Sequence, residues 1–368
     1  MSNKGTLLTE KALRPKILFI TCANILSQQK NFGGSVISYR NYRLLSEFCD
    51  VDVVFPKKFN NKFAKAYYYF LKRRLYYDNS QIREIFNLIE SNKYTAVFFD
   101  YSVNGNLVKL IKRNFNLPAI SFFHNIEKFY YSRVVKKWVS IVEHCEKQTI
   151  KFSDKLLLLN KRDIKELKSV YNIKNLENIV VMPVTLKDDF NLQNDKYESF
   201  WNDDKKVALF FGSAFPPNYE GIKWFVNEVM PNVDCNLVIA GKGFGQYCDE
   251  LTRPNVKVFD VVGDVQTLFN GADFFVSPIF VGSGMKVKTC EALKFGKTIF
   301  GTDETFIGYD LDFDLVGGKC NTAKEFITKI NTEITKVSNC KFNNYSRAVF
   351  LEKYEDAVAL NILKEIID

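Results

Sequence analysis

The chain has 368 residues, which exceeds one ordinary domain and suits two domains of about 180 residues each. Its 46% hydrophobic and 25% charged residues describe a globular protein and exclude a disordered or fibrous one. The formal net charge of +9 predicts an anionic partner, such as a nucleotide, a phospholipid surface or a nucleic acid.

The class of protein is restricted further by its cysteines, its histidines and its lack of long apolar runs. The eight Cys form no CxxC pair, which indicates buried thiols in a reducing compartment. Only two His occur, so we expect no multi-histidine site, no metal and no cofactor. No apolar run approaches the ~20 residues of a membrane span, and residues 1–15 lack the apolar core of a signal peptide. We therefore expect a cytoplasmic protein, either soluble or peripheral at the inner face of the membrane.

The first half alternates strands and helices. The apolar run at 16–23 predicts a buried strand of a parallel sheet. It leads to a glycine loop at Gly33 and Gly34 and a helix over 36–48, with Ser35 as its N-cap. A glycine loop before a helix suits a nucleotide phosphate, although any tight turn can use one. Further strands are expected at 51–55, 96–100, 118–123, 155–160 and 179–183, with helices at 81–91, 107–114, 133–152 and 161–171.

Acidic residues and histidines in this half offer candidate sites. Asp50 and Asp52 have a D-x-D spacing that can hold a metal, but they begin an alternating run, and we interpret them as a strand edge. His124 follows a predicted strand directly, at the carboxyl edge where α/β proteins bind ligands. A lone His is more often structural, yet this position makes His124 a candidate, whereas His144 is an ordinary helix-face residue.

Residues 57–77 are unusual, with seven Lys or Arg, eight aromatic residues and no acid in KKFNNKFAKAYYYFLKRRLYY. Cations and aromatic rings at helical spacing suit a helix lying on an anionic membrane. The same residue types can stack nucleic acid bases over a basic groove. A solvated helix with an aromatic core face also fits. We expect no nucleic acid, because the basic stretch is local, and keep the membrane as a candidate partner.

The second half restarts the alternating pattern after a polar, acidic linker at 186–206. Three glycines at 241, 243 and 245 lack the G-x-G-x-x-G spacing, so they form no dinucleotide fingerprint. Strands are expected at 207–211, 237–240, 256–258, 272–280 and 298–301, with helices at 219–229, 265–270 and 345–367.

The stretch VGSGMKVKTCEALKF at 281–295 predicts a glycine turn followed by a helix. Such a turn lets a phosphate approach the backbone, and the first helical N–H groups bind it. Lys286 and Lys288 add positive charge, and Glu291 lies one turn beyond Lys288 on the same face. This combination suits a nucleotide, with cations for the diphosphate and a carboxylate for ribose hydroxyls. An ordinary βα turn with solvated lysines fits these residues equally well.

Two parallel βα domains with an anion site in the second resemble a GT-B glycosyltransferase. The resemblance implies an α/β fold of two Rossmann-like parallel-sheet domains facing a cleft. Residues 1–187 would form the acceptor-side domain, with the C-terminal helix at about 350–368 packed back on it, and 188–349 the donor domain. Glycosyltransferase family 4 is similar over about 207–308, through FFGSAFPPNYEGIKWFVNEVMP, LVIAGKGF and VVGDVQTLFNGADFFVSPIFVGSGMKVKTCEALKFGKTIFGT.

The resemblance to family 4 assigns roles to residues of this chain. Glu291 would bind the donor ribose, the turn at 282–284 the diphosphate and sugar, and His124 would lie across the cleft. His124, Lys288 and Glu291 are thus the predicted catalytic residues. The predicted donor-binding residues are Gly33, Gly34, Gly212, Ser213, Asn218, Gly241, Val262, Gly282, Ser283, Gly284, Met285, Lys286, Lys288 and Glu291.

This sequence also departs from the family pattern. Many members have a sugar-contacting Glu seven residues before the ribose-binding one, and here that position is Ser283. Many also carry an Arg and a Lys for the phosphates after the first strand of the second domain, but residues 213–218 contain no cation. We therefore expect Lys286 and Lys288 to supply that charge.

The resemblance implies a retaining, metal-independent glycosyltransferase. It would transfer a sugar from a nucleotide-diphosphate sugar to a glycan or lipid-linked acceptor, in bacterial surface polysaccharide or glycoconjugate synthesis. A sugar-nucleotide epimerase on the same fold is an alternative, which needs cleft carboxylates such as Glu127. A non-catalytic partner protein with a degenerate donor site is another, which Ser283 mildly favours.

Overall fold

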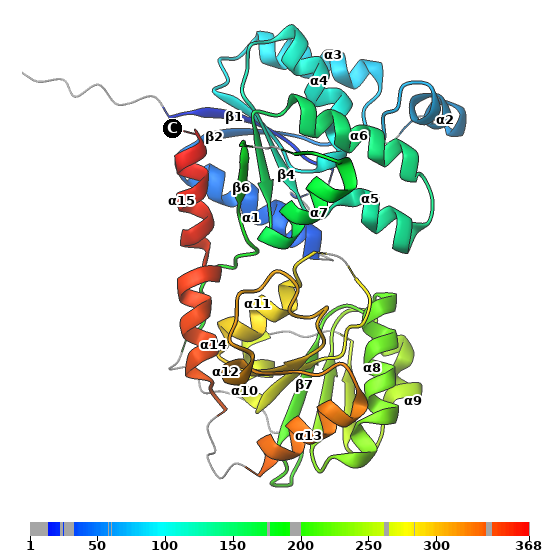
Figure 1. The fold of residues 1–368 in the computed structure, drawn as a ribbon, viewed down its shortest axis with the longest axis vertical. Helices are drawn as coiled ribbons and strands as arrows, with labels where there is room; N and C mark the ends of the chain where they lie inside the picture. The colour runs from blue at the N-terminus through cyan, green and yellow to red at the C-terminus, as the bar shows by residue number, and fades with distance from the viewer. Residues whose placement is uncertain are drawn as a thin grey trace, which may run out of the picture.

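The computed structural model describes residues 14–22, 25, 33–57, 59, 61–174, 177–191, 200–260, 265–282, 284–335 and 341–367. They form two stacked domains, each a six-stranded parallel sheet with helices on both faces (Figure 1). The strand orders are β2-β1-β3-β4-β5-β6 and β12-β11-β10-β7-β8-β9. The predicted α/β class with two Rossmann-like domains is confirmed.

The first domain follows a regular strand and helix alternation. Its strands are β1 (Lys16–Ile20), β2 (Asp50–Val54), β3 (Ala96–Phe99), β4 (Ala119–Phe123), β5 (Lys155–Leu158) and β6 (Ile179–Val181). Its helices are α1 (Gly33–Phe48), α2 (Lys62–Phe70), α3 (Asn79–Glu90), α4 (Gly105–Asn114), α5 (Glu127–Tyr130), α6 (Val139–Phe152) and α7 (Lys161–Tyr171), with short turns at Ser102–Asn104 and Tyr131–Val135.

The second domain repeats the alternation. Its strands are β7 (Val207–Phe211), β8 (Asn236–Ala240), β9 (Val256–Phe259), β10 (Phe274–Ser277), β11 (Thr298–Gly301) and β12 (Gly317–Lys319). Its helices are α8 (Pro216–Glu228), α9 (Cys248–Leu251), α10 (Val265–Gly271), α11 (Val287–Lys294), α12 (Phe313–Val316) and α13 (Ala323–Ile334), followed by α14 (Asn344–Val349) and α15 (Asp356–Ile367).

Central strands are apolar along their whole length because helices cover both faces of each sheet. Phe19 of β1 and Phe98 of β3 are fully buried and stack with ring centroids 5.2 Å apart. In the second domain, Phe269 and Phe295 stack at 4.5 Å. This packing fixes the sheets, so the loops at the carboxyl ends of the strands stand on rigid supports.

The chain passes between the domains at two points that lie side by side. Leu186 donates its N–H to the Tyr354 carbonyl at 3.0 Å, and its own carbonyl accepts from Asp356 N at 3.1 Å. Helix α15 then returns to pack on α1 of the first domain (Figure 1). There Asp356 forms an ion pair with Arg43 and accepts a hydrogen bond from Thr185 Oγ1 at 2.8 Å. These side-chain contacts attach both interdomain connections, near Leu186 and near Asp356, to helix α1.

Asp50 and Asp52 lie in the edge strand β2, as the strand-edge interpretation predicts. The Asp52 carboxylate pairs with Lys16 Nζ at 3.0 Å and accepts from Tyr94 Oη at 2.6 Å. Asp50 begins the strand and Asp52 is its middle residue, so neither lies in the loop at its carboxyl end. Within the described residues, no group of three or more His, Cys, Asp or Glu is arranged to hold a metal ion.

Several predicted helix boundaries are wrong. Helix α1 begins at Gly33, so Ser35 lies inside its first turn and is not the N-cap. Of the segment 57–77, only Lys62–Phe70 is helical, because Arg73 adopts a positive φ of 51° that a right-handed helix cannot contain.

No helix in the described ranges is long and apolar enough to cross a membrane.

Two long predicted helices are interrupted. The helix expected over 133–152 begins only at Val139, because Lys136 and Trp138 take positive φ values of 55° and 62°. The helix expected over 345–367 is broken by a π turn at Phe350–Tyr354, where the chain pairs with Leu186. Tertiary pairing of the two connections overrides the helical pattern at that point.

Candidate donor site

The loops after β7 and β8 meet at the carboxyl edge of the second sheet. Gly212 and Gly241 have positive φ values of 154° and 144°. A Cβ atom on Gly241 would lie 1.9 Å from the Gly212 carbonyl oxygen, so no other residue type fits this approach. The two glycines therefore bring the backbones of adjacent loops into direct contact.

Lys288 of α11 reaches the loop after β7 and the first turn of α8. Its Nζ donates to Asn218 Oδ1 at 2.7 Å, and Asn218 Nδ2 donates to the Ser213 carbonyl at 2.7 Å. A Cβ on Gly212 would lie 2.9 Å from the same Nζ. The lysine thus stands beside the stretch where the sequence has no cation of its own.

The charge of Lys288 has no acidic partner within salt-bridge distance in the part of the chain that the structure describes. Its Nζ lies 4.5 Å from the centroid of the Phe210 ring. Burial lowers the pKa of Lys288 to about 7, with Lys286 acting in the same direction and Glu291 against it. An incoming phosphate would stabilise the protonated form, so the site favours an anionic ligand.

Lys286 has a different environment. Its Nζ donates to Glu304 Oε1 at 2.6 Å and to the Gly284 carbonyl at 2.9 Å, while Tyr309 Oη donates to the Lys286 carbonyl at 2.7 Å. Burial lowers the pKa of Lys286, and Glu304 opposes that shift. Lys286 therefore holds the glycine turn in place and has a carboxylate beside its charge.

Glu291 lies one helical turn beyond Lys288 on α11 and is half-buried. Burial raises the pKa of Glu291 to about 7, and Lys294 and Lys288 lower it. Among the described residues, none donates a hydrogen bond to its carboxylate. A half-buried carboxylate that lacks donors is suited to ligand hydroxyl groups.

His124 follows β4 in the first domain, and its side chain is 7% exposed. Its Nε2 lies 2.9 Å from the Asp100 carbonyl, which can only accept, so Nε2 carries a proton. The ring stacks on Tyr101 with centroids 4.2 Å apart. Gly34, at the start of α1, is beside the same tyrosine, since its Cβ would lie 3.3 Å from Tyr101 Oη. Gly33, Gly34 and His124 therefore occupy one edge of the first domain.

The second domain contacts this edge of the first domain at Gly284, in the turn before α11. Its φ is +64°, and a Cβ on it would lie 2.4 Å from Asn125 Oδ1 and 3.0 Å from the His124 carbonyl oxygen. Sequence reasoning did not single out Asn125. Only its position one residue past His124, at a strand end, could have suggested this contact.

A second contact between the domains lies beside the first. A Cβ on Gly308, whose φ is +82°, would lie 2.6 Å from both Asn160 Nδ2 and Met285 Cγ. Met285 is buried there. The structure thus brings Gly284 and Met285 of the second domain beside His124 and Asn160 of the first. The candidates Val262 and Ser283 lie outside the described residues.

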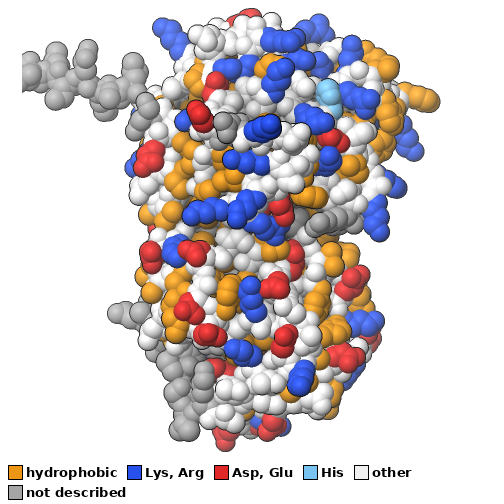
Figure 2. Space-filling view, viewed as in Figure 1, with side chains coloured by type: hydrophobic (Ala, Val, Ile, Leu, Met, Phe, Trp, Pro, Cys, Tyr) orange, Lys and Arg blue, Asp and Glu red, His pale blue; other side chains and the backbone are white. Residues whose placement is uncertain are grey.

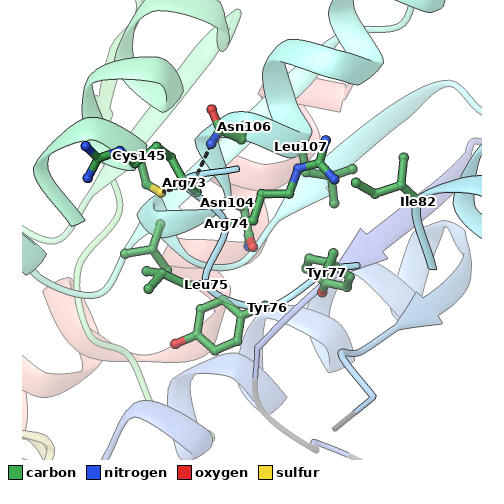
Figure 3. Close-up of a pocket in the computed structure, with 11 residues that line it drawn as sticks. Arg73, Arg74, Leu75, Tyr76, Tyr77, Ile82, Asn104, Asn106, Leu107 and Cys145 are labelled. Carbon is green, nitrogen blue, oxygen red and sulfur yellow. Dashed lines mark hydrogen bonds between the residues drawn. The ribbon is translucent and has the colours of Figure 1, made fainter. Parts of the chain in front are cut away.

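A separate hollow lies within the first domain between the 73–77 segment, α4 and α6 (Figure 3). Its lining includes Arg73, Arg74, Tyr77 and Asn104. Asn106 Nδ2 donates to the Lys72 carbonyl at 3.1 Å, and Cys145 Sγ donates to the Arg73 carbonyl at 3.2 Å. None of the predicted site residues lines this hollow.

Residues 205–330 match the protein family described as Glycosyl transferases group 1. This part of the chain is similar to the domains of group 1 glycosyltransferases. The match covers the turn at 282–284, Lys288 and Glu291, as well as the loops after β7 and β8. The predicted relationship to GT-B group 1 enzymes is confirmed.

Solved structures of this fold cover nearly the whole chain. Sucrose-phosphate synthase from Thermosynechococcus elongatus is 11% identical, with a TM-score of 0.72 over 96% of this chain and 98% of that one. HepE of Anabaena, in complex with UDP and glucose, is 13% identical, with a TM-score of 0.65 over 96% and 99%. These similarities establish the GT-B fold.

A curated relative comes from the cps region of a bacterium. It is an uncharacterized 44.6 kDa protein in the cps region of Klebsiella pneumoniae, 25% identical, covering 78% of this chain and 77% of the relative. The group 1 domain and the fold together support a nucleotide-sugar glycosyltransferase.

Proposed function

We propose that the protein is a retaining glycosyltransferase that transfers a sugar from a nucleoside-diphosphate sugar to a glycan or lipid-linked acceptor. The observation that carries the proposal is the position of Lys288, whose ammonium group stands beside Asn218 and Gly212 with no acidic partner among the described residues. Diphosphate oxygens would complete its coordination, and the amino end of α11 would add backbone N–H groups.

Glu291 and His124 fit the remaining parts of the donor. The Glu291 carboxylate would accept hydrogen bonds from the ribose hydroxyls, one turn from the diphosphate. His124 would lie opposite the donor, because its carbonyl oxygen is beside Gly284 at the contact between the two domains. The complexes of HepE with UDP and UDP-glucose support uridine nucleotides as the first donors to test.

The reaction requires stabilisation of the departing nucleoside diphosphate. Lys288 and the turn amides would supply it without a metal. The Glu304 carboxylate near the turn is engaged by Lys286, which disfavours it as a nucleophile. We therefore propose front-face transfer, in which the acceptor oxygen bonds to the anomeric carbon as the phosphate leaves and the phosphate takes the acceptor proton.

A role in surface polysaccharide synthesis is supported by the Klebsiella pneumoniae relative in a cps region. Such acceptors are commonly lipid-linked, which places the reaction at a membrane surface. The outer edge of the first domain fits that location, because hydrophobic and basic side chains gather there over α2 (Figure 2). Helix α2 buries none of its residues, and the exposed fractions are 88% for Phe63 and 73% for Leu71.

Trp138 extends this surface from the loop before α6. It is 41% exposed and contacts Tyr69 and Phe70 with ring centroids 5.4 and 5.5 Å away. Apolar rings flanked by lysines suit the interface of an anionic membrane. We propose peripheral association of a cytoplasmic enzyme with the inner membrane face through this surface, which we call the α2 surface (Lys62–Leu71 and Trp138).

A thermal-shift screen with UDP, GDP, ADP and CMP sugars tests the donor proposal, because a bound ligand raises the unfolding temperature. We expect stabilisation by one nucleotide class, and transfer or slow hydrolysis of its sugar by the purified protein. Binding without either reaction would favour the non-catalytic partner. A change of sugar configuration without transfer would favour the epimerase.

A further inference from the structure

The glycine turn before α11 has no side chain at Gly282 or Gly284 to contact a donor sugar. Apart from Ser283, which lies outside the described residues, the side chains that contact a sugar on the diphosphate would therefore come from neighbouring elements. Glu304, from the loop after β11, comes close to this turn. A Cβ on Gly282 would lie 2.8 Å from Glu304 Oε1, and 3.1 Å from Lys286 Nζ.

Glu304 is held in one orientation but not fully engaged. Its Oε1 accepts from Lys286 Nζ at 2.6 Å. No hydrogen bond to Oε2 is formed by any residue that the structure describes. The side chains of Lys286 and Glu304 are 13% and 16% exposed, so both are largely shielded from solvent but retain some exposed surface.

The Lys286–Glu304 pair faces the first domain. Arg162 and Asp163, at the start of α7, are near enough to influence the Lys286 ammonium group electrostatically. Asn160, directly before α7, contacts Gly308 beside the turn. The pair therefore lies at the boundary between the two domains, next to where the diphosphate would sit, and not on the outer surface of the second domain.

Resting on the proposed function, we propose that Glu304 binds hydroxyl groups of the donor sugar and restricts the donor to an uncharged sugar. An ionised carboxylate accepts two hydrogen bonds from adjacent sugar hydroxyls. Lys286 fixes Glu304 and is itself occupied by that carboxylate, so its ammonium group is not available to pair with an acidic sugar. A uronic acid carboxylate at this position would meet the Glu304 carboxylate, and like charges at short range repel.

Isothermal titration with UDP, UDP-glucose, UDP-galactose and UDP-glucuronic acid tests the inference. We expect the wild-type protein to bind at least one of the two neutral sugar nucleotides about tenfold more tightly than UDP, and to bind UDP-glucuronic acid no better than UDP. Glu304→Gln should remove most of the gain from the neutral sugar. Its affinity for UDP should change less than twofold, because Lys286 can still donate to the amide oxygen.

Asp303→Asn is the matched control, because Asp303 is the adjacent acid but pairs with Lys319 at 2.9 Å. We expect it to bind every ligand as the wild type does. Glu304→Asp provides a second variant that keeps the charge, and it should retain part of the preference for a neutral sugar over UDP-glucuronic acid.

Wild-type discrimination in Glu304→Gln would overturn the inference while leaving the proposed function intact. Equal losses for UDP and the neutral sugar nucleotide, with a lower unfolding temperature, would show that Glu304 only balances Lys286, and would also overturn it. A wild-type protein that gives no thermal shift with any nucleotide sugar would instead contradict the proposed function itself.

Discussion

Lys288 Nζ lies 2.7 Å from Asn218 Oδ1, and this bond joins helix α11 to the first turn of helix α8. The two residues are 70 positions apart in the chain. The contact places a cation beside residues 213–218, where the sequence has none. Lys288 can therefore supply positive charge to a diphosphate from helix α11, at the same edge of the sheet as the loop after β7.

Replacing Lys288 should weaken nucleotide binding. We expect Lys288→Met to lower the affinity for UDP about 10- to 100-fold, which corresponds to roughly 1.4–2.8 kcal/mol for a lost charge-assisted contact. Because burial lowers the pKa of Lys288 to about 7, wild-type affinity should also fall as the pH rises above 7. Titration calorimetry from pH 6 to 9 measures both effects. Lys319→Met, on β12, is the control, and equal affinities of the two variants would contradict this assignment.

Gly284→Ala should disturb the contact between the domains. The added Cβ would lie 2.4 Å from Asn125 Oδ1, at a φ of +64° that costs an alanine about 1 kcal/mol or more. We expect transfer to fall at least about tenfold, because reacting groups tolerate little displacement. Gly318→Ala is the control, since its Cβ would meet only the flexible Lys329 side chain. Activity assays with circular dichroism would separate lost geometry from lost folding, and full activity in Gly284→Ala would argue against a closed catalytic contact there.

Glu127 should make the protein less stable as the pH rises. Burial raises its pKa to about 8, the neighbouring Glu146 adds to the shift, and the Asn125 side chain opposes it. The folded state therefore keeps a proton that the unfolded chain loses near pH 4.5, so this group's contribution to stability falls between about pH 4.5 and 8. Urea unfolding across this range should show a smaller decline for Glu127→Gln than for the wild type. Glu352→Gln is the exposed control, and identical pH profiles for Glu127→Gln and the wild type would contradict the prediction.

The α2 surface should bind anionic vesicles. We expect co-sedimentation with vesicles containing phosphatidylglycerol, weakened by high salt because part of the attraction is electrostatic. Phe63→Ser combined with Leu71→Ser should reduce binding at least about tenfold, since each exposed apolar side chain would otherwise enter the interface. Leu351→Ser, at an exposed position on the π turn, is the control. Vesicle binding unchanged in the double variant would exclude this surface.

Local patterns in the sequence were sufficient for the alternation of strands and helices. Apolar runs such as 207–211 predict buried parallel strands because both faces of these sheets are covered. Boundaries were less certain where the backbone takes a positive φ, as at Arg73 and Trp138. No side-chain pattern signals those conformations, because neighbouring elements impose them.

The sequence by itself determined the two-domain α/β fold and the candidate turn at 282–284 with its lysines and Glu291. These follow from periodicity, glycine spacing and charge, all of which are local properties. Only the tertiary structure decided how the lysines differ, with Lys288 reaching Asn218 and Lys286 held by Glu304. It also decided that Asn125 of the first domain lies beside Gly284 of the second. These contacts join residues far apart in the chain, and they depend on strand order and domain packing, which no local pattern encodes.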